Sequence, residues 1–204
     1  MPPNPAVTPE GVRDGNPAAI AGLIDRRGGA VLAYCAAICP PDLVERGAAE
    51  AFARFRAAVV AADSPYDLNP EVALLAATRQ SAAWLARVSP PAPTVTKLLR
   101  RKEDPLQHVP TLLVARANGE LSAPDVQRLT QLLEKSPQAR EVQSSFRRAE
   151  EAYRDDATPR VPPGTHAVLA AAMAAAAPIA PAVDEAEAPA VNGANGASHA
   201  AVAS

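Results

Sequence analysis

The stretch Asn118-Gly119-Glu120-Leu121-Ser122 decides how the second half of the chain folds. Asparagine followed by glycine favours the left-handed residue that ends a helix, so a helix over 110–117 is expected to end at this pair. Ser122, with Asp125 three residues later, is close to a capping box and predicts the start of the next helix. The stretch therefore predicts a tight turn between two helices.

A second stretch, Leu132-Leu133-Glu134-Lys135-Ser136-Pro137-Gln138-Ala139-Arg140, leads into a further helix over 137–154. Together the two stretches resemble a small zinc module of bacterial anti-sigma factors, which has a histidine and a Cys-x-x-Cys pair as metal ligands. These positions read Leu132, Ser136 and Ala139 here. Neither a serine hydroxyl nor a methyl group replaces a thiolate as a zinc ligand. The resemblance therefore implies the helical frame of the module without its metal.

Without a metal, the second module must be held together by packing. His108 stands near the first ligand position of the resembled module, but one histidine cannot hold a metal, so an ordinary surface or capping role is expected. Six apolar residues at helical spacing are the expected core: Leu113, Leu121, Leu129, Leu133, Val142 and Phe146.

The composition indicates a helical protein with a sparse core. The 204 residues carry a formal net charge of −2, and 48% are hydrophobic although only 3% are aromatic. Much of the apolar content is alanine, which favours helix but buries little surface. The first residues lack the features of a secretory signal, and the apolar run 167–183 is too weakly hydrophobic for a membrane span. We expect a soluble, cytoplasmic protein with no membrane partner and no small-molecule substrate.

The fold class is predicted to be all-α: a three-helix bundle, a small helical module and a disordered Ala/Pro-rich tail. Proline-containing breaks separate three helices of the first half, over about 16–38, 43–62 and 70–88, and Gly28-Gly29 is expected to weaken or kink the first of them. The predicted organisation is a disordered N-terminus at 1–15, a helical domain at 16–89, a linker with a basic segment at 90–105, the second module at 106–157, and a low-complexity tail at 158–204 with a short helix at 166–177.

Three stretches of the first half carry another resemblance: Asp14–Leu23, Glu50–Phe55 and Ala77–Arg87. They resemble the second region of extracytoplasmic-function sigma factors, which binds core RNA polymerase and opens the promoter. Residues 16–89 would then form a sigma-region-2-like domain. The chain departs from the family at Arg46, where a carboxylate is expected, and it has no counterpart of the promoter-reading fourth region.

The resemblance places several basic and aromatic residues toward promoter DNA. Trp84 would stack on an unpaired base, and the basic residues would contact phosphates. The plainer interpretation is a solvated arginine face, a tryptophan packed in the core and a solvated basic helix end. Both interpretations stay open for Arg79, Trp84, Arg87, Arg100, Arg101 and Lys102.

The family's contact with the polymerase clamp falls on the middle helix of the first half. Glu50, Arg54 and Arg56 are the candidate polymerase-binding residues. Phe52 and Phe55 stand in the same stretch and are expected to be core residues, because aromatic side chains with these spacings are typical of a buried helix face.

The sequence gives little support to an enzyme. It contains no Gly-rich phosphate loop, nucleophile elbow or His-Glu metal motif, so neither catalysis nor a cofactor is expected. Cys35 and Cys39 lie four residues apart and are expected to be small core residues, because a redox pair usually has a gap of two residues.

The two resemblances together predict a non-enzymatic regulator of transcription. It would bind core RNA polymerase or a sigma factor, with promoter contact as one option, and the alternative is an anti-sigma-like interaction module that does not bind DNA. The resemblance implies that the second module packs either on the first domain or on another sigma factor. Because the module lacks zinc, docking on the first domain of the same chain is favoured, since it would gain buried surface there.

Overall fold

The computed structural model describes residues 7–88, 105–155 and 160–176, and these residues form helices joined by short connections, with no strand among them. The predicted all-α fold class is therefore confirmed. The order along the chain is α1 (Pro9–Arg13), α2 (Pro17–Ile38), a 3-10 turn η1 (Pro41–Leu43), α3 (Val44–Ala61), α4 (Pro70–Val88), a second turn η3 (Pro105–His108), α5 (Val109–Asn118), α6 (Ala123–Lys135), α7 (Pro137–Arg154) and α8 (Pro163–Ala175).

The helix boundaries follow the capping residues that the sequence displays. Asn16 caps α2 by accepting the Ala18 N–H at 2.9 Å, and Pro17 occupies the first helical position. Gly119 ends α5 with a φ of 76°, the left-handed conformation predicted from Asn118-Gly119. Ser122 then caps α6 by accepting the Asp125 N–H at 3.4 Å. The predicted turn between two helices is confirmed.

One prediction about the first half was wrong. Residues 9–13, expected to be disordered, form α1, because Thr8 caps that helix and Val12 is buried in the core. The pair Gly28-Gly29 lies inside α2, which continues through it as one helix. A Cβ at Gly28 would lie 2.5 Å from the Val161 side chain, so the glycine allows the segment before α8 to approach the helix closely.

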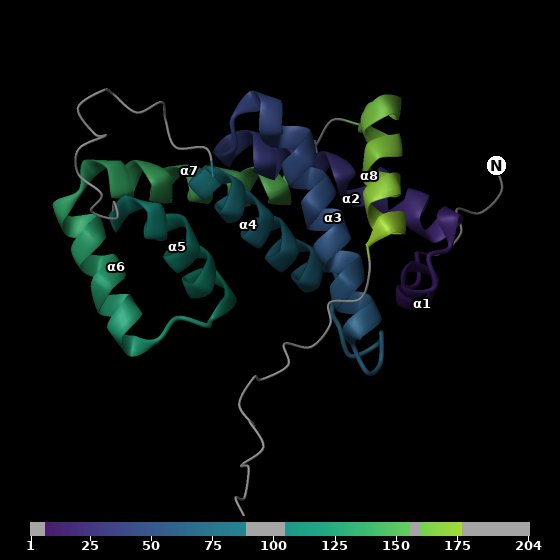
Figure 1. Cartoon of the computed structure of the whole chain (residues 1–204), viewed down its shortest axis with the longest axis horizontal. Coiled ribbons are helices and arrows are strands. Elements are labelled where there is room, and N and C mark those ends of the chain that lie inside the picture. The colour runs from purple at the N-terminus through teal and green to yellow at the C-terminus, as the bar shows by residue number, and fades with distance from the viewer. Residues whose placement is uncertain (1–6, 89–104, 156–159, 177–204) are drawn as a thin grey trace, which may run out of the picture.

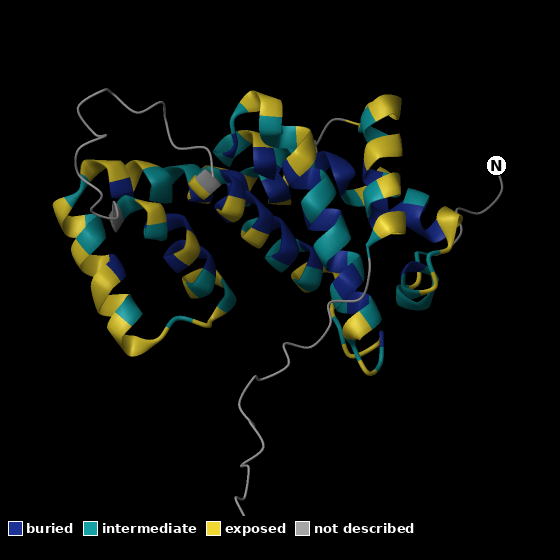
Figure 2. Ribbon diagram, in the orientation of Figure 1, coloured by how far each residue is buried: buried dark blue, intermediate teal, exposed yellow. Residues whose placement is uncertain are grey.

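The main core lies between α2, α3 and α4, which pack on one another (Figures 1 and 2). Tyr34, Phe52 and Phe55 are its buried rings, and Leu74 and Leu85 come from α4. The burial of both phenylalanines confirms the prediction that they are core residues. Val72 is one of the apolar residues of the predicted helix over 70–88 that helical spacing indicates as core, but it is exposed, because it lies in the first turn of α4 on the side facing solvent.

A smaller core holds α5, α6 and α7 together. It contains Leu113, Leu129 and Phe146, with Leu121, Leu133 and Val142 partly buried against it. These are the six apolar residues expected to form the core of the second module, and all six lie in it, three of them only partly buried. Val126 lies three residues before Leu129, a helical spacing that predicts an inward-pointing side chain, but it is exposed. Much of α6 is exposed along its length in Figure 2.

The helix α7 belongs to both halves of the molecule. Its first half packs on α5 and α6, whereas Ala149 and Tyr153 lie in the main core against α2. The Tyr153 ring meets the Tyr34 ring edge-on at a centroid distance of 6.3 Å, and the Arg27 guanidinium lies 4.5 Å from the Tyr153 ring centroid. The predicted docking of the second module on the first is thus present. The linker expected at 90–105 lies outside the described residues except for Pro105, which begins η3.

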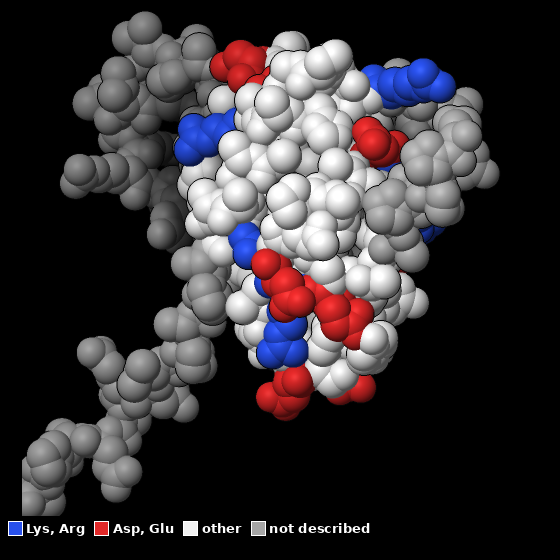
Figure 3. Space-filling model, turned by 90° about the vertical axis from the view of Figure 1, so that its right-hand side faces the viewer, with Lys and Arg blue, Asp and Glu red and all other residues white. Residues whose placement is uncertain are grey.

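The C-terminal helix α8 packs on α2 and α3 through Leu169 and Met173, which are fully buried. Thr165 Oγ1 donates a hydrogen bond to Glu45 Oε2 at 3.0 Å, and His166 Nε2 lies 3.4 Å from Asp25 Oδ1. The short helix predicted at 166–177 therefore exists with slightly earlier bounds. Its sequence contains no Lys, Arg, Asp or Glu, and Figure 3, which faces this side of the molecule, shows an uncharged centre with acidic and basic side chains below it and at its edges. None of the helices in the described ranges is long and apolar enough to cross a membrane.

Candidate functional site

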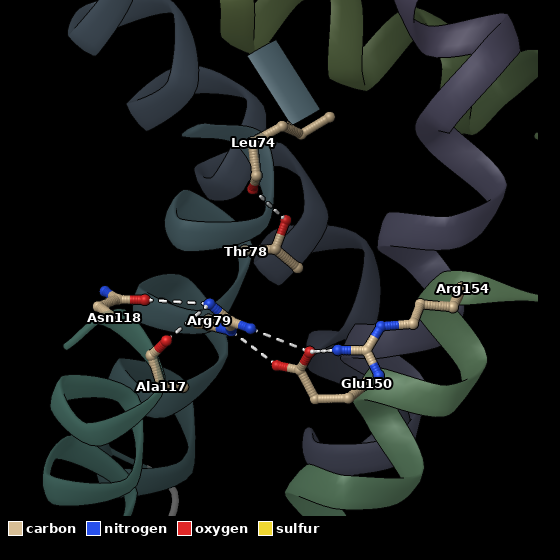
Figure 4. A network of polar contacts seen from close by, with 7 residues as sticks. All are labelled: Leu74, Thr78, Arg79, Ala117, Asn118, Glu150 and Arg154. Carbon is tan, nitrogen blue, oxygen red and sulfur yellow. Dashed lines mark hydrogen bonds and ion pairs between the residues drawn. The ribbon is translucent and has the colours of Figure 1, made fainter. Parts of the chain in front are cut away.

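A partly buried polar network joins α4, α5 and α7 (Figure 4). Arg79 donates from Nε to Glu150 Oε1 at 2.6 Å and from Nη2 to Glu150 Oε2 at 3.0 Å. Its Nη1 donates to Asn118 Oδ1 at 3.2 Å, and Arg154 donates to Glu150 Oε2 at 3.3 Å. The Arg79 and Glu150 side chains are only 13% and 18% exposed. This bidentate pair therefore fixes the two halves of the chain to each other.

Pairing with Glu150 favours the charged form of Arg79 in spite of its burial. Burial alone would lower the pKa of Arg79, because it disfavours the charged form, but the hydrogen bond and the charge of Glu150 outweigh it and the pKa is raised. Arg79 is thus held as a cation inside the protein. The residue that the sequence placed toward promoter DNA is engaged by a carboxylate of the second module.

A second candidate residue, Arg56, is also used within the molecule. Its Nη1 donates to the backbone carbonyls of Met173 and Ala174, the latter at 2.9 Å. These carbonyls lie in the last turn of α8, where a cation interacts favourably with the helix dipole. Arg56 therefore holds α8 on α3, and it does not lie with the other candidate polymerase-binding residues.

Three candidate residues, Glu50, Arg54 and Trp84, lie on one partly exposed surface, which we call the α3–α4 face. Glu50 and Arg54 are paired at 2.9 Å on α3, and Arg46 precedes them by one turn on the same side. The Arg46 guanidinium lies 5.5 Å from the centroid of the Trp84 ring. The side of α3 that carries Arg46, Glu50 and Arg54 therefore borders α4 at Trp84. Trp84 is exposed, and so is Arg87 one turn later, but Arg87 Nη1 donates to Thr111 Oγ1 at 3.5 Å and so lies toward α5.

Trp84 is the most informative residue of the α3–α4 face. It is 41% exposed, whereas the plainer interpretation of the sequence placed it in the core. Its contact with Arg46 is a cation–π interaction, for which about 0.5–1 kcal/mol is typical at exposed sites. Arg46 was noted only as a departure from the family pattern, and no sequence signal showed that it would lie over Trp84.

The positions that resemble zinc ligands have ordinary structural roles. Ser136 caps α7 by accepting the Ala139 N–H at 3.2 Å, and Ala139 is fully buried in the smaller core. In the part of the chain that the structure describes, no group of three or more His, Cys, Asp and Glu side chains is placed to hold a metal ion. Cys35 and Cys39 are free and buried, as predicted for small core residues.

The remaining candidates Arg100, Arg101 and Lys102 lie outside the described residues. Sequence reasoning missed Glu150, the partner of Arg79, because 71 positions separate the two residues and no motif links them. Comparison with known proteins gives no match, whether to protein-family models, to curated proteins or to solved structures. Function must therefore be inferred from the residues of this chain.

Proposed function

We propose that this protein regulates transcription by binding another protein, either core RNA polymerase or a sigma factor, through the α3–α4 face. The observation that carries the proposal is the exposed Trp84 beside Arg46 and the Glu50–Arg54 pair. Tryptophan and arginine are the side chains most enriched among residues that dominate binding energy at protein interfaces. The resemblance of residues 13–88 to the second region of sigma factors supports this choice of partner.

The rigidity of the face also supports a binding role. Both helices pack on the main core through buried side chains such as Phe55 and Leu85, so the exposed residues are held in fixed positions. A preorganised surface loses less conformational entropy when a partner binds. No catalytic role is proposed for these side chains.

The engagement of Arg79 favours a protein partner over direct promoter binding. Because its guanidinium is bound by Glu150, contact with DNA would depend on Trp84, Arg87 and the basic segment 100–102. The second candidate function is therefore an anti-sigma-like interaction module that does not contact DNA. The two functions share the α3–α4 face and differ in whether promoter DNA is retained.

The test is a pull-down of the full chain with core polymerase, with a purified sigma factor, and with a labelled promoter fragment added to each. We expect Trp84→Ala to weaken capture of the partner at least tenfold, because it removes the central ring. Val168→Ala is the matched control, since Val168 is 42% exposed on α8, and it should leave capture unchanged. Melting curves of both variants verify that the fold is intact.

The outcomes separate the candidates. Capture of polymerase with salt-sensitive retention of the promoter fragment supports a sigma-like role. Capture of a sigma factor without DNA supports the anti-sigma-like role. The proposal is wrong if neither protein is captured, or if Trp84→Ala binds as well as the unaltered chain.

A further inference from the structure

A cationic groove between α5 and α7 lies apart from the α3–α4 face. Its volume is about 630 Å³, within the range of ligand-binding clefts. Tyr34 and Arg79 border it from α2 and α4, while Leu113 and Phe146 contribute apolar wall from α5 and α7. Its charged residues are five arginines and one glutamate: Arg79, Arg116, Arg140, Arg147, Arg154 and Glu150.

Glu150, the one carboxylate among the lining residues of the groove, does not neutralise the five arginines. Glu150 is already bound by Arg79 and Arg154, and Arg140 donates to the last carbonyls of α6, Leu133 at 2.9 Å and Glu134 at 3.1 Å. Arg147 is 76% exposed, and its only ion pair with a described residue is a 4.0 Å contact with Glu151. Arg116 is exposed and makes no ion pair with the described residues. The groove therefore keeps a positive field that an anion can use.

The arginines of α7 are regularly spaced along the groove. Arg140, Arg147 and Arg154 follow one another at intervals of seven residues, so they lie along one side of the helix about 10 Å apart. In a peptide in the polyproline II conformation, which has about three residues per turn and a rise of about 3.1 Å per residue, side chains three residues apart lie on the same side at a similar distance of about 9 Å. Acidic residues at such intervals would each meet one guanidinium, which pairs with a carboxylate through two parallel hydrogen bonds.

We propose that this groove binds an acidic peptide segment of a partner protein, with carboxylates on the arginines and an apolar side chain against Phe146 and Leu113. The charge pattern favours a peptide over a nucleic-acid strand. A strand has a charge on every nucleotide, so some phosphates would lie next to Glu150 and Glu151. A peptide can place uncharged residues opposite these two carboxylates and acidic residues opposite the arginines.

The experiment titrates the full-length protein into a fluorescent peptide with glutamate at every third position and one central leucine. We expect binding that weakens as salt rises and is lost when the glutamates are replaced by glutamine. The double variant Arg116→Glu with Arg147→Glu should reduce affinity at least tenfold. The matched control is Arg128→Glu with Arg148→Glu, which changes the same net charge at exposed positions outside the groove and should reduce affinity less than threefold.

Several results would overturn the proposal. These are failure of the acidic peptide to bind, equal binding of the glutamine peptide, equal losses in the two double variants, and tighter binding of a single-stranded oligonucleotide than of the peptide. Trp84→Ala should leave peptide binding intact, so failure of this proposal and failure of the α3–α4 face are distinguishable. Melting curves show whether each double variant remains folded.

Discussion

The two cores of this molecule differ in what fills them. In the main core three aromatic rings, Tyr34, Phe52 and Phe55, are at most 2% exposed. In the smaller core the largest side chain, Phe146, is 8% exposed, and α6 contributes only one fully buried residue, Leu129. A helix that buries so little apolar surface gains little stability from its neighbours. The comparison indicates that the second half depends on the first.

The dependence is concentrated in α7. Its Ala149 and Tyr153 enter the main core, and Glu150 between them binds Arg79. In zinc modules of similar size, the metal contributes roughly 10 kcal/mol or more to folding. Here the corresponding positions hold the Ser136 cap and the buried Ala139 methyl, so the docking of α7 is the compensating contact that the structure offers.

The largest effect is expected when the second region is separated from the first. Residues 95–157 expressed alone should be largely unfolded, because the fragment loses α2 and α4 as partners of α7. Far-ultraviolet circular dichroism should show little helix for the fragment, whereas the whole chain should melt in one cooperative transition. A fragment that is helical and melts cooperatively would show that the smaller core is sufficient by itself.

The next effect concerns the ion pair between the regions. Glu150→Ala should destabilise the whole chain by about 3 kcal/mol, because it leaves the Arg79 guanidinium buried without a counter-charge. Glu151→Ala is the matched control. Its carboxylate is 67% exposed and 4.0 Å from Arg147, so the change should be within about 0.5 kcal/mol. Chemical denaturation of both variants measures the difference, and equal effects would contradict the role given to Glu150.

A double substitution separates the charge from the packing. Arg79→Met combined with Glu150→Leu removes both charges and keeps apolar volume, so it should be clearly more stable than Glu150→Ala alone. If the double variant is as unstable as the single one, hydrogen bonds of Arg79 to Asn118 and to the end of α5 matter more than the ion pair.

Local features of the fold could be predicted from the sequence, and long-range partners could not. Asn16-Pro17, Asn118-Gly119 and Ser122 mark helix ends because capping acts between residues at most a few positions apart. The pairs Arg79–Glu150 and Arg46–Trp84 depend on how helices pack, which no local pattern encodes. The same holds for Val72 and Val126, whose apolar character predicted burial although each lies on the exposed side of its helix.

Only part of the candidate site could be predicted from the sequence, because the rest depends on long-range packing. Trp84, Glu50 and Arg54 could be selected by resemblance, but only the packing of α3 on α4 puts them on one surface. Conversely, Arg56 and Arg79 looked like surface contacts, since the sequence does not show that α8 and α7 cover them. Charged residues are normally exposed, so burial of an arginine by a distant carboxylate has no signal in a single sequence.

The smallest effect is expected at the boundary between the two regions, where the Tyr34 hydroxyl is buried without a hydrogen bond to a described residue. Tyr34→Phe keeps the ring and its edge-on contact with Tyr153, so the free energy of unfolding at pH 7 should be unchanged or higher by up to about 1 kcal/mol. A decrease in the free energy of unfolding would show that the hydroxyl contributes to the docking of α7. The boundary between the two regions would then be more polar than its geometry indicates.

Tyr34→Phe should also change how the free energy of unfolding depends on pH, and the burial of Tyr34 determines the direction of that change. Desolvation raises the pKa of Tyr34 above its ordinary value of 10.0 in the folded state. Above pH 10 the unfolded chain releases this proton and the folded chain retains it, so stability is present below pH 10 and falls as the pH rises. Between pH 8 and pH 11 the loss from one such group is about 1.4 kcal/mol. Tyr34→Phe should lack this part of the loss, whereas Tyr66→Phe, at an exposed position, should retain it.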